Sequence, residues 1–230
     1  MSLGVSYQKP ERRLTSDTRL HILAMIVLRE TMPTATGRNE AMIGDTPLPF
    51  PLGHGSVTVT SRHGRAVHIR HIAAEDAERL VDLFNHLSPE TRRMRFFSPR
   101  IDTPDEVLWP EAVRLADINP LVEVALIATV PENGEEHAVG VARLIREAEG
   151  APQAEVAIVL RDDYQGEGLG TALFDLLVQV AMVRGLKRLL AVSLAENVAF
   201  QHLVRNSGLP FTSQTIRGET TTTITLSDES

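Results

Sequence analysis

The stretch RDDYQGEGLGT at residues 161–171 decides the fold of this chain, because it joins a short apolar run to a strongly helical one. The apolar run covers residues 156–160, and helix-forming residues follow from Leu169 onward. The first N–H groups of a helix have no intrahelical partner, and the aligned peptide dipoles add partial positive charge there. Glycines at alternate positions let the backbone approach a ligand and adopt positive φ. Strand, glycine loop and helix in this order predict a site for a phosphate or pyrophosphate group.

Two common phosphate ligands fit the loop poorly. A dinucleotide fold uses G-x-G-x-x-G and an acidic residue about 20 residues later, at the end of the next strand. This chain has G-x-G-x-G instead, and the next apolar strand, residues 186–193, carries no acidic residue. A nucleoside triphosphate loop requires Gly-Lys-Ser or Gly-Lys-Thr, which does not occur in the sequence.

The loop Gln165-Gly166-Glu167-Gly168-Leu169-Gly170 resembles the acyl-CoA pyrophosphate loop of the GNAT superfamily of N-acyltransferases. Residues 196–209 are similar to the family's Asn-x-x-Ala helix beside the pantetheine arm, and residues 67–76 to its first strand and the start of its first helix. The resemblance implies an α/β GNAT fold, a mixed and mostly antiparallel twisted sheet flanked by helices. We assign this domain to residues 61–230 and an N-terminal extension, partly irregular, to residues 1–60.

A narrower resemblance is to bacterial protein lysine acetyltransferases that modify acyl-CoA synthetases. LSPETRRMRFFSP at residues 87–99 is similar to the Leu-Ser-Pro-Glu-Ser-x-x-x-Arg-Phe-Phe-Ser-Pro segment of that group. AEVA at residues 154–157 is similar to the strand of that group that bears a glutamate. It implies transfer of an acetyl group from acetyl-CoA to a lysine ε-amine, with an acyl-CoA synthetase as a candidate protein partner. Such domains are often fused to a synthetase-like or cyclic-nucleotide-binding module, and an extension of sixty residues is too short for either.

Acyl transfer to an amine requires the neutral amine, and a lysine with a pKa near 10.4 is neutral in only about one part in 10³ to 10⁴ at pH 7. A base beside the acceptor is therefore valuable, and Glu155 is the candidate by its strand position and by the resemblance. In the family this strand splays from its parallel neighbour. Backbone groups near Ile158, Val159 and Leu160 would then hold the pantetheine and polarise the thioester carbonyl.

Other functions stay open on the sequence. A small-molecule amine acetyltransferase would share every motif named above. A non-catalytic acyl-CoA-binding module is a further alternative, because Val204 stands where many GNAT enzymes carry a tyrosine that protonates the leaving thiolate. A thiol with a pKa around 8.5 leaves tolerably well without that proton donor, so the substitution does not exclude catalysis.

The remaining site residues follow from the loop and from the helix after it. We expect the side chain of Glu167 to point to solvent, because a carboxylate is awkward beside a phosphate. Asn197 either binds the donor or caps its helix, and Tyr164 is a packing residue of the loop. The residues expected to bind the donor are Ile158, Val159, Leu160, Gln165, Gly166, Glu167, Gly168, Leu169, Gly170, Thr171, Asn197 and Phe200.

Composition limits the classes of function. A chain of 230 residues with 43% hydrophobic content can bury one full core, and its net charge of −7 argues against general nucleic-acid binding. The chain has no cysteine, which removes disulfides and thiolate metal sites and is compatible with a reducing cytoplasm. The apolar run at residues 22–28 is too short to span a membrane. We expect a cytoplasmic monomer or homodimer with no metal, since His68 and His71 would face opposite sides of one strand.

Local patterns predict the elements around the loop. Apolar residues from Ala77 to Leu87 recur at helical spacing, and Ser88-Pro89 supplies the cap and first turn of a second short helix. A cluster of four arginines follows, which we expect to be a solvated, salt-bridged face, although it could instead meet an acidic protein partner or the CoA 3'-phosphate; its members are Arg92, Arg93, Arg95 and Arg100. The expected strands are 67–72, 122–130, 139–146, 153–160, 186–193 and 220–226, and the later helices run from 169 to a stop at Gly185 and from 198 to 206.

Overall fold

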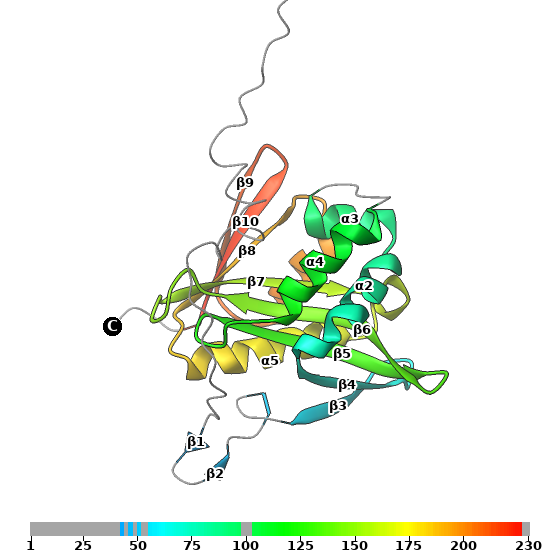
Figure 1. Cartoon of the computed structure of the whole chain (residues 1–230). Helices are drawn as coiled ribbons and strands as arrows, with labels where there is room; N and C mark the ends of the chain where they lie inside the picture. The colour runs from blue at the N-terminus through cyan, green and yellow to red at the C-terminus, as the bar shows by residue number, and fades with distance from the viewer. Residues whose placement is uncertain (1–41, 44–45, 48–49, 52–54, 98–102, 227–230) are drawn as a thin grey trace, which may run out of the picture. The chain divides into compact units, whose positions relative to one another are not determined.

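The computed structural model describes residues 42–43, 46–47, 50–51, 55–97 and 103–226 (Figure 1). The apolar run at residues 22–28 and Arg100 lie outside them. In the described part of the chain, no helix is long and apolar enough to cross a membrane. Two short strands, β1 (Met42–Ile43) and β2 (Thr46–Pro47), pair with each other in antiparallel fashion.

The other eight strands form one sheet, in the order β3-β4-β5-β6-β7-β8-β10-β9. All neighbours are antiparallel except β7 and β8, which are parallel, so the expected mixed and mostly antiparallel sheet is confirmed. The strands are β3 (Ser56–Thr60), β4 (Ala66–His71), β5 (Glu123–Glu132), β6 (Glu135–Ile145), β7 (Gln153–Leu160), β8 (Arg188–Leu194), β9 (Phe211–Ile216) and β10 (Glu219–Thr225).

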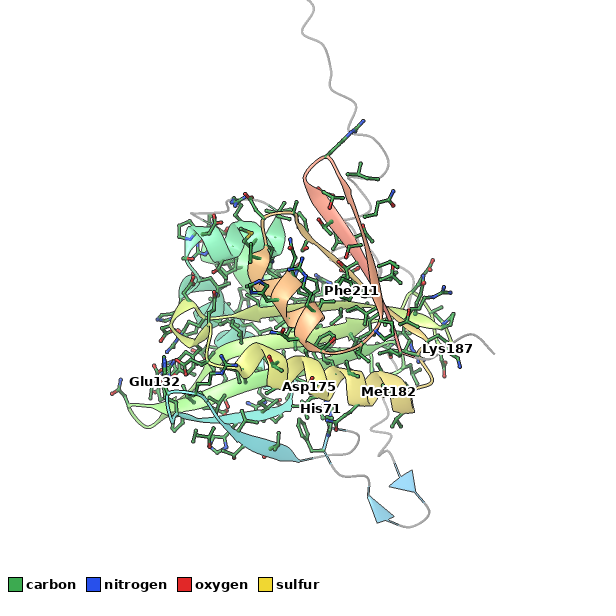
Figure 2. All side chains as sticks on the ribbon, turned by 180° about the vertical axis from the view of Figure 1, so that it is seen from behind. His71, Glu132, Asp175, Met182, Lys187 and Phe211 are labelled. Carbon is green, nitrogen blue, oxygen red and sulfur yellow. The ribbon has the colours of Figure 1, made fainter. Side chains whose placement is uncertain are left out.

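Helices cover both faces of the sheet. Figure 1 shows α2 (Ala77–Asn85), α3 (Pro89–Phe96) and α4 (Asp105–Ala116) on one face. Figure 2, from behind, shows α5 (Leu169–Val183) and α6 (Val198–Asn206) on the other. Each face has its own apolar core, one built around α5 and the other around α2 and α4.

The strand β7 separates the two cores by alternation. Ala154 and Val156 are buried against the α5 side, whereas Val159 packs toward the α2 and α4 side. Because successive side chains of a strand point to opposite faces, Glu155 shares the face of Val159. Glu155, the candidate base, thus lies on the face opposite the helix that follows the glycine loop.

The predicted caps and turns are present. The hydroxyl of Ser88 accepts a hydrogen bond from the Thr91 N–H at 3.1 Å, and Pro89 occupies the first turn of α3. The hairpin between β5 and β6 turns at Asn133 and Gly134, both with positive φ, as a two-residue turn between twisted strands requires. The helix α5 ends at Val183, and Gly185, which follows the capping residue Arg184, also has positive φ.

Three elements did not follow from the sequence patterns. The helix α4 was not predicted, nor was the edge strand β9, which is exposed along its whole length. Residues 56–60, assigned above to the N-terminal extension, form β3 and pair with β4 along its length. The turn between β3 and β4 brings Ser61 to Arg65 to the end of the sheet where β7 finishes, which matters for the site.

Candidate acyl-CoA site

The strands β7 and β8 part soon after they begin to pair. Their parallel register covers only three residue pairs, the last of which joins Glu155 to Leu190. Residues 156–159 of β7 continue to pair with β6 on their other side. Figure 1 shows β8, β9 and β10 at a steep angle to β7 and its neighbours. The backbone edge of β7 that faces the gap therefore has N–H and C=O groups without a strand partner, which an extended amide-bearing ligand can satisfy.

The glycine loop leads from this gap into α5. Gly166 and Gly168 have φ of 74° and 88°, a region that favours glycine, and Gly168 is the residue that caps α5. In the part of the chain that the structure describes, no side-chain hydrogen bond caps the start of this helix. The free N–H groups of the first turn are therefore available to an anion, as the sequence predicted.

The expectation that Glu167 points to solvent is wrong. Its side chain is only 2% exposed and is held by the turn between β3 and β4. Arg65 donates from Nε to Oε2 at 3.2 Å and also binds Oε1, and His63 Nδ1 lies 2.9 Å from Oε1. Hydrogen bonds from Arg65 and then Ser61 hold the pKa of Glu167 at about 2. The carboxylate is thus neutralised inside the protein and does not face a ligand.

The start of α3 is tied to the same loop by Asp162. Its carboxylate accepts hydrogen bonds from Ser88 N at 2.8 Å, from Ser88 Oγ at 2.6 Å and from Thr91 Oγ1 at 2.7 Å. Burial alone would raise the pKa of Asp162, but these hydrogen bonds outweigh it and leave the pKa lowered. Gln165 adds a bond from Nε2 to Thr91 Oγ1 at 3.1 Å and another to the carbonyl of Leu160.

The same helix also reaches the other side of the gap. Arg93 pairs with Glu90 within α3 and with Glu196, which follows β8. The helix α3 therefore bridges the loop after β7 and the loop after β8. Of the predicted arginine cluster, Arg93 is salt-bridged as expected, whereas Arg92 is buried and lies over the ring of Phe84.

Glu155 stands at the point where the two strands separate. Its carboxylate makes no hydrogen bond or ion pair to any residue that the structure describes, although it is partly buried. A cation on α3, Arg95, is close enough to interact with it electrostatically. Burial lowers the pKa of Arg95 to about 10, against the opposing effect of the Glu155 charge, so the guanidinium is still charged at neutral pH. An available carboxylate thus sits beside a fixed positive charge on the α3 face.

Comparison with known proteins agrees with this geometry. The sequence pattern of the acetyltransferase (GNAT) domain matches residues 66–210.

The chain belongs to the GNAT acetyltransferase family.

Acetyltransferase PA5475 of Pseudomonas aeruginosa is 36% identical over 140 residues, covering 61% of this chain and 73% of that protein. Acetyltransferase Pat of Mycolicibacterium smegmatis is 30% identical over 194 residues, or 84% of this chain, which spans only 52% of that protein. Among solved structures, the GNAT domain of S. lividans PAT matches with a TM-score of 0.62 at 27% identity, over 73% of this chain and 95% of that one. As a GNAT acetyltransferase, this protein uses acetyl-CoA as its acyl donor.

The structure brings most of the predicted GNAT site residues to one place. Ile158, Val159 and Leu160 line the end of β7, and residues 165–171 follow directly. Asn197 caps α6 by accepting the Phe200 N–H at 3.0 Å, so the helix-cap reading of Asn197 is realised. A role of Asn197 and Phe200 in donor binding stays a prediction.

Several other side chains are placed by packing. Tyr164 is 4% exposed, with the guanidinium of Arg65 stacked 3.4 Å from its ring centroid, which agrees with a packing role. Val204 is buried in the core on the α5 side. His68 bonds Thr58, and no cluster of potential metal ligands occurs among the residues that the structure describes.

Sequence reasoning missed the contacts that hold the loop. Arg65 and Glu167 are separated by 102 residues, and Ser88 and Asp162 by 74. One signal exists for the second pair, because the sequence Ser88-Pro89 predicts a helix cap. No local signal points from the β3–β4 turn to the glycine loop.

Proposed function

We propose that this protein transfers the acetyl group of acetyl-CoA to the ε-amine of a protein lysine, with Glu155 as the general base. The position of Glu155 carries the proposal. It is a partly buried carboxylate without a hydrogen bond in the described part of the chain, located where β7 and β8 separate. A carboxylate that serves only structure would be expected to have a partner there.

The donor would enter from the α5 side and the acceptor from the α3 side. The pyrophosphate would lie at the start of α5 on the N–H groups of residues 165–171, and the pantetheine along the unpaired edge of β7 beyond Glu155. Glu155 shares the opposite face with Val159, where Arg95 of α3 interacts with its charge. The lysine would therefore approach past α3, the segment that resembles protein lysine acetyltransferases.

The reaction then needs one bond exchange at the carbonyl carbon and the loss of two protons from the lysine nitrogen. Glu155, directly or through a water, accepts a proton from the lysine ammonium, and the neutral nitrogen attacks the thioester carbonyl carbon. Backbone N–H groups near Ile158 to Leu160 would stabilise the resulting oxyanion. The C–S bond breaks and the CoA thiolate leaves, while the attacking nitrogen gives up its second proton to water; the thiolate takes its proton from water, because Val204 offers none.

The similarity to acetyltransferase Pat of Mycolicibacterium smegmatis, at 30% identity, supports the acetyl transfer in this proposal. An acyl-CoA synthetase is the acceptor that the sequence resemblance favours. A cytoplasmic location and a monomeric or homodimeric state are part of the same proposal.

The test mixes the purified protein with acetyl-CoA and an acyl-CoA synthetase from the same source. Thiol release and lysine acetylation are followed by mass spectrometry for the wild type, for Glu155→Gln and for Glu149→Gln. Glu149 is an exposed carboxylate in the loop before β7, so it controls for loss of one charge. We expect Glu155→Gln to lower kcat by about 10² or more, the usual contribution of a general base, and Glu149→Gln to match the wild type.

Three results would contradict parts of the proposal. Full activity of Glu155→Gln would remove this residue from the chemistry. Thiol release with small amines but no acetylation of the synthetase would show that the acceptor is a small molecule. Binding of CoA with no turnover on any amine would indicate an acyl-CoA-binding module.

A further inference from the structure

The turn between β3 and β4 packs against the glycine loop although about a hundred residues separate them. The backbone N–H of Arg62 donates to the carbonyl of Glu167 at 3.0 Å. The side chains of His63 and Arg65 hold the Glu167 carboxylate, and Arg65 also binds the carbonyl of Asp163. The turn is therefore fixed to the loop by both backbone and side chains.

The two arginines of this turn have different surroundings. Arg65 is used within the protein, since it pairs with Glu167 and stacks on Tyr164. The Arg62 side chain is exposed and makes no hydrogen bond or ion pair to any residue that the structure describes. Its Nε lies 3.7 Å, and its Cγ 3.9 Å, from the position that a Cβ on Gly168 would occupy. Arg62 thus extends along the residue that caps α5.

This position is unfavourable for a cation unless an anion is present. The start of α5 carries partial positive charge from its peptide dipoles, which disfavours a second positive group. The carboxylate of Glu167, in the same loop, is already paired with Arg65 and hydrogen-bonded to His63. Arg62 and the N–H groups of α5 therefore present two positive features to the same space with no negative partner from the described chain.

We propose that Arg62 binds the pyrophosphate of acetyl-CoA, and that the Glu167–Arg65 pair holds the β3–β4 turn in position to do so. A guanidinium binds phosphate oxygens in a two-pronged geometry that suits this role. The proposal rests on the donor site described under "Proposed function" and adds a residue from outside it. Arg62 and Arg65 precede the segment that matches the GNAT domain, residues 66–210, so the family pattern does not include them.

The test is isothermal titration calorimetry of CoA and of dephospho-CoA, which lacks the 3'-phosphate, with the full chain. The proteins are the wild type, Arg62→Ala, Arg62→Lys and Lys187→Ala. Lys187 follows the opposite end of α5 and controls for general loss of a cation (Figure 2). Arg62→Ala should fold normally because the hydrogen bond of Arg62 to Glu167 uses the backbone, and thermal unfolding checks this.

We expect Arg62→Ala to lower the affinity for both CoA and dephospho-CoA about 10-fold. This is the low end of the effect of a charge-assisted hydrogen bond at an exposed site. The affinity of Arg62→Lys for both ligands should lie between those of the wild type and Arg62→Ala, and Lys187→Ala should bind like the wild type. The difference in affinity between the wild type and Arg62→Ala should become smaller as the salt concentration is raised. Unchanged CoA affinity in Arg62→Ala would overturn the proposal, and a loss for CoA alone would assign Arg62 to the 3'-phosphate instead.

Failure of this inference is distinguishable from failure of the proposed reaction, because CoA binding requires neither a lysine acceptor nor Glu155. A wild type that does not bind CoA would overturn the donor site and the role of Arg62 together. A wild type that binds CoA and acetylates protein, with Arg62→Ala unchanged, would leave the reaction intact and remove only Arg62.

Discussion

Substituting Asp162 by Asn should loosen the docking of α3 while leaving the rest of the fold intact. The carboxylate accepts three hydrogen bonds from Ser88 and Thr91 at the start of that helix. An amide has one oxygen and no charge, so it cannot accept all three and makes weaker bonds. Hydrogen bonds to a charged group contribute about 1.5 to 3 kcal/mol each when buried, but Asp162 is exposed to solvent. After allowance for screening, we expect a loss of about 1 to 2 kcal/mol in total.

Hydrogen exchange followed by mass spectrometry measures this loss locally. A change of about 1 to 2 kcal/mol raises the population of the undocked helix roughly 5- to 30-fold. Amides of residues 88–97 should exchange faster by that factor, whereas those of α5 should not change. The matched control is Asp163→Asn, the adjacent carboxylate, which binds Arg161 and Arg65 and, among the residues that the structure describes, forms no hydrogen bond or ion pair with α3.

The same bonds predict a pH dependence. The pKa of Asp162 is lowered in the folded protein, so its contribution is complete above the unfolded-state value of about 3.9. It is lost only as the pH falls through the lower folded value. Protection of α3 should therefore be constant from pH 7 to pH 5. Unchanged exchange of residues 88–97 in Asp162→Asn, or an equal change in Asp163→Asn, would refute the reasoning.

Two further substitutions test the framework of the site. Asp76→Ala removes a carboxylate that is 1% exposed and binds Arg70 at 2.6 and 2.8 Å, which should cost about 2 to 3 kcal/mol in urea unfolding, with the exposed Glu75→Ala as a neutral control. A cost below about 0.5 kcal/mol would contradict the pairing. Gly140→Ala would place a methyl group 2.4 Å from a Leu160 side-chain carbon and 3.2 Å from a backbone carbonyl of β7, so we expect about 1 to 3 kcal/mol of destabilisation and weaker CoA binding by calorimetry. If Gly140→Ala keeps both the stability and the CoA affinity of the wild type, β7 can shift to accept the methyl group without affecting the site.

Much of the fold could be predicted because its signals are local. The cap at Ser88, the stop at Gly185 and the apolar spacing of the helices each lie within a few residues. The order of these elements, with the glycine loop, was sufficient to indicate the mixed sheet. The helix α4 escaped because it contains Pro110 and carries exposed apolar residues, including Trp109, so its pattern is not that of an amphipathic helix.

The error at Glu167 has a different origin. From the sequence alone, a carboxylate inside a phosphate loop has only the ligand and the solvent as neighbours. Exposure to solvent is then the favoured prediction, because a phosphate would repel the carboxylate. The fold adds a third neighbour, because the pairing of β3 with β4 places Arg65 and His63 at the end of the sheet where the loop begins. A paired carboxylate can then be buried without the full desolvation cost.

The sequence by itself determined the family, the phosphate-binding loop and Glu155 as the candidate base, since each is encoded by residues adjacent along the chain. Only the tertiary structure decided which distant groups meet: Asp162 with the start of α3, Glu167 with Arg65, and Arg62 with Gly168. It also decided that β7 and β8 separate at Glu155. The physical reason is that strand register and helix docking fix these contacts, and both depend on how the whole sheet packs between its two apolar cores.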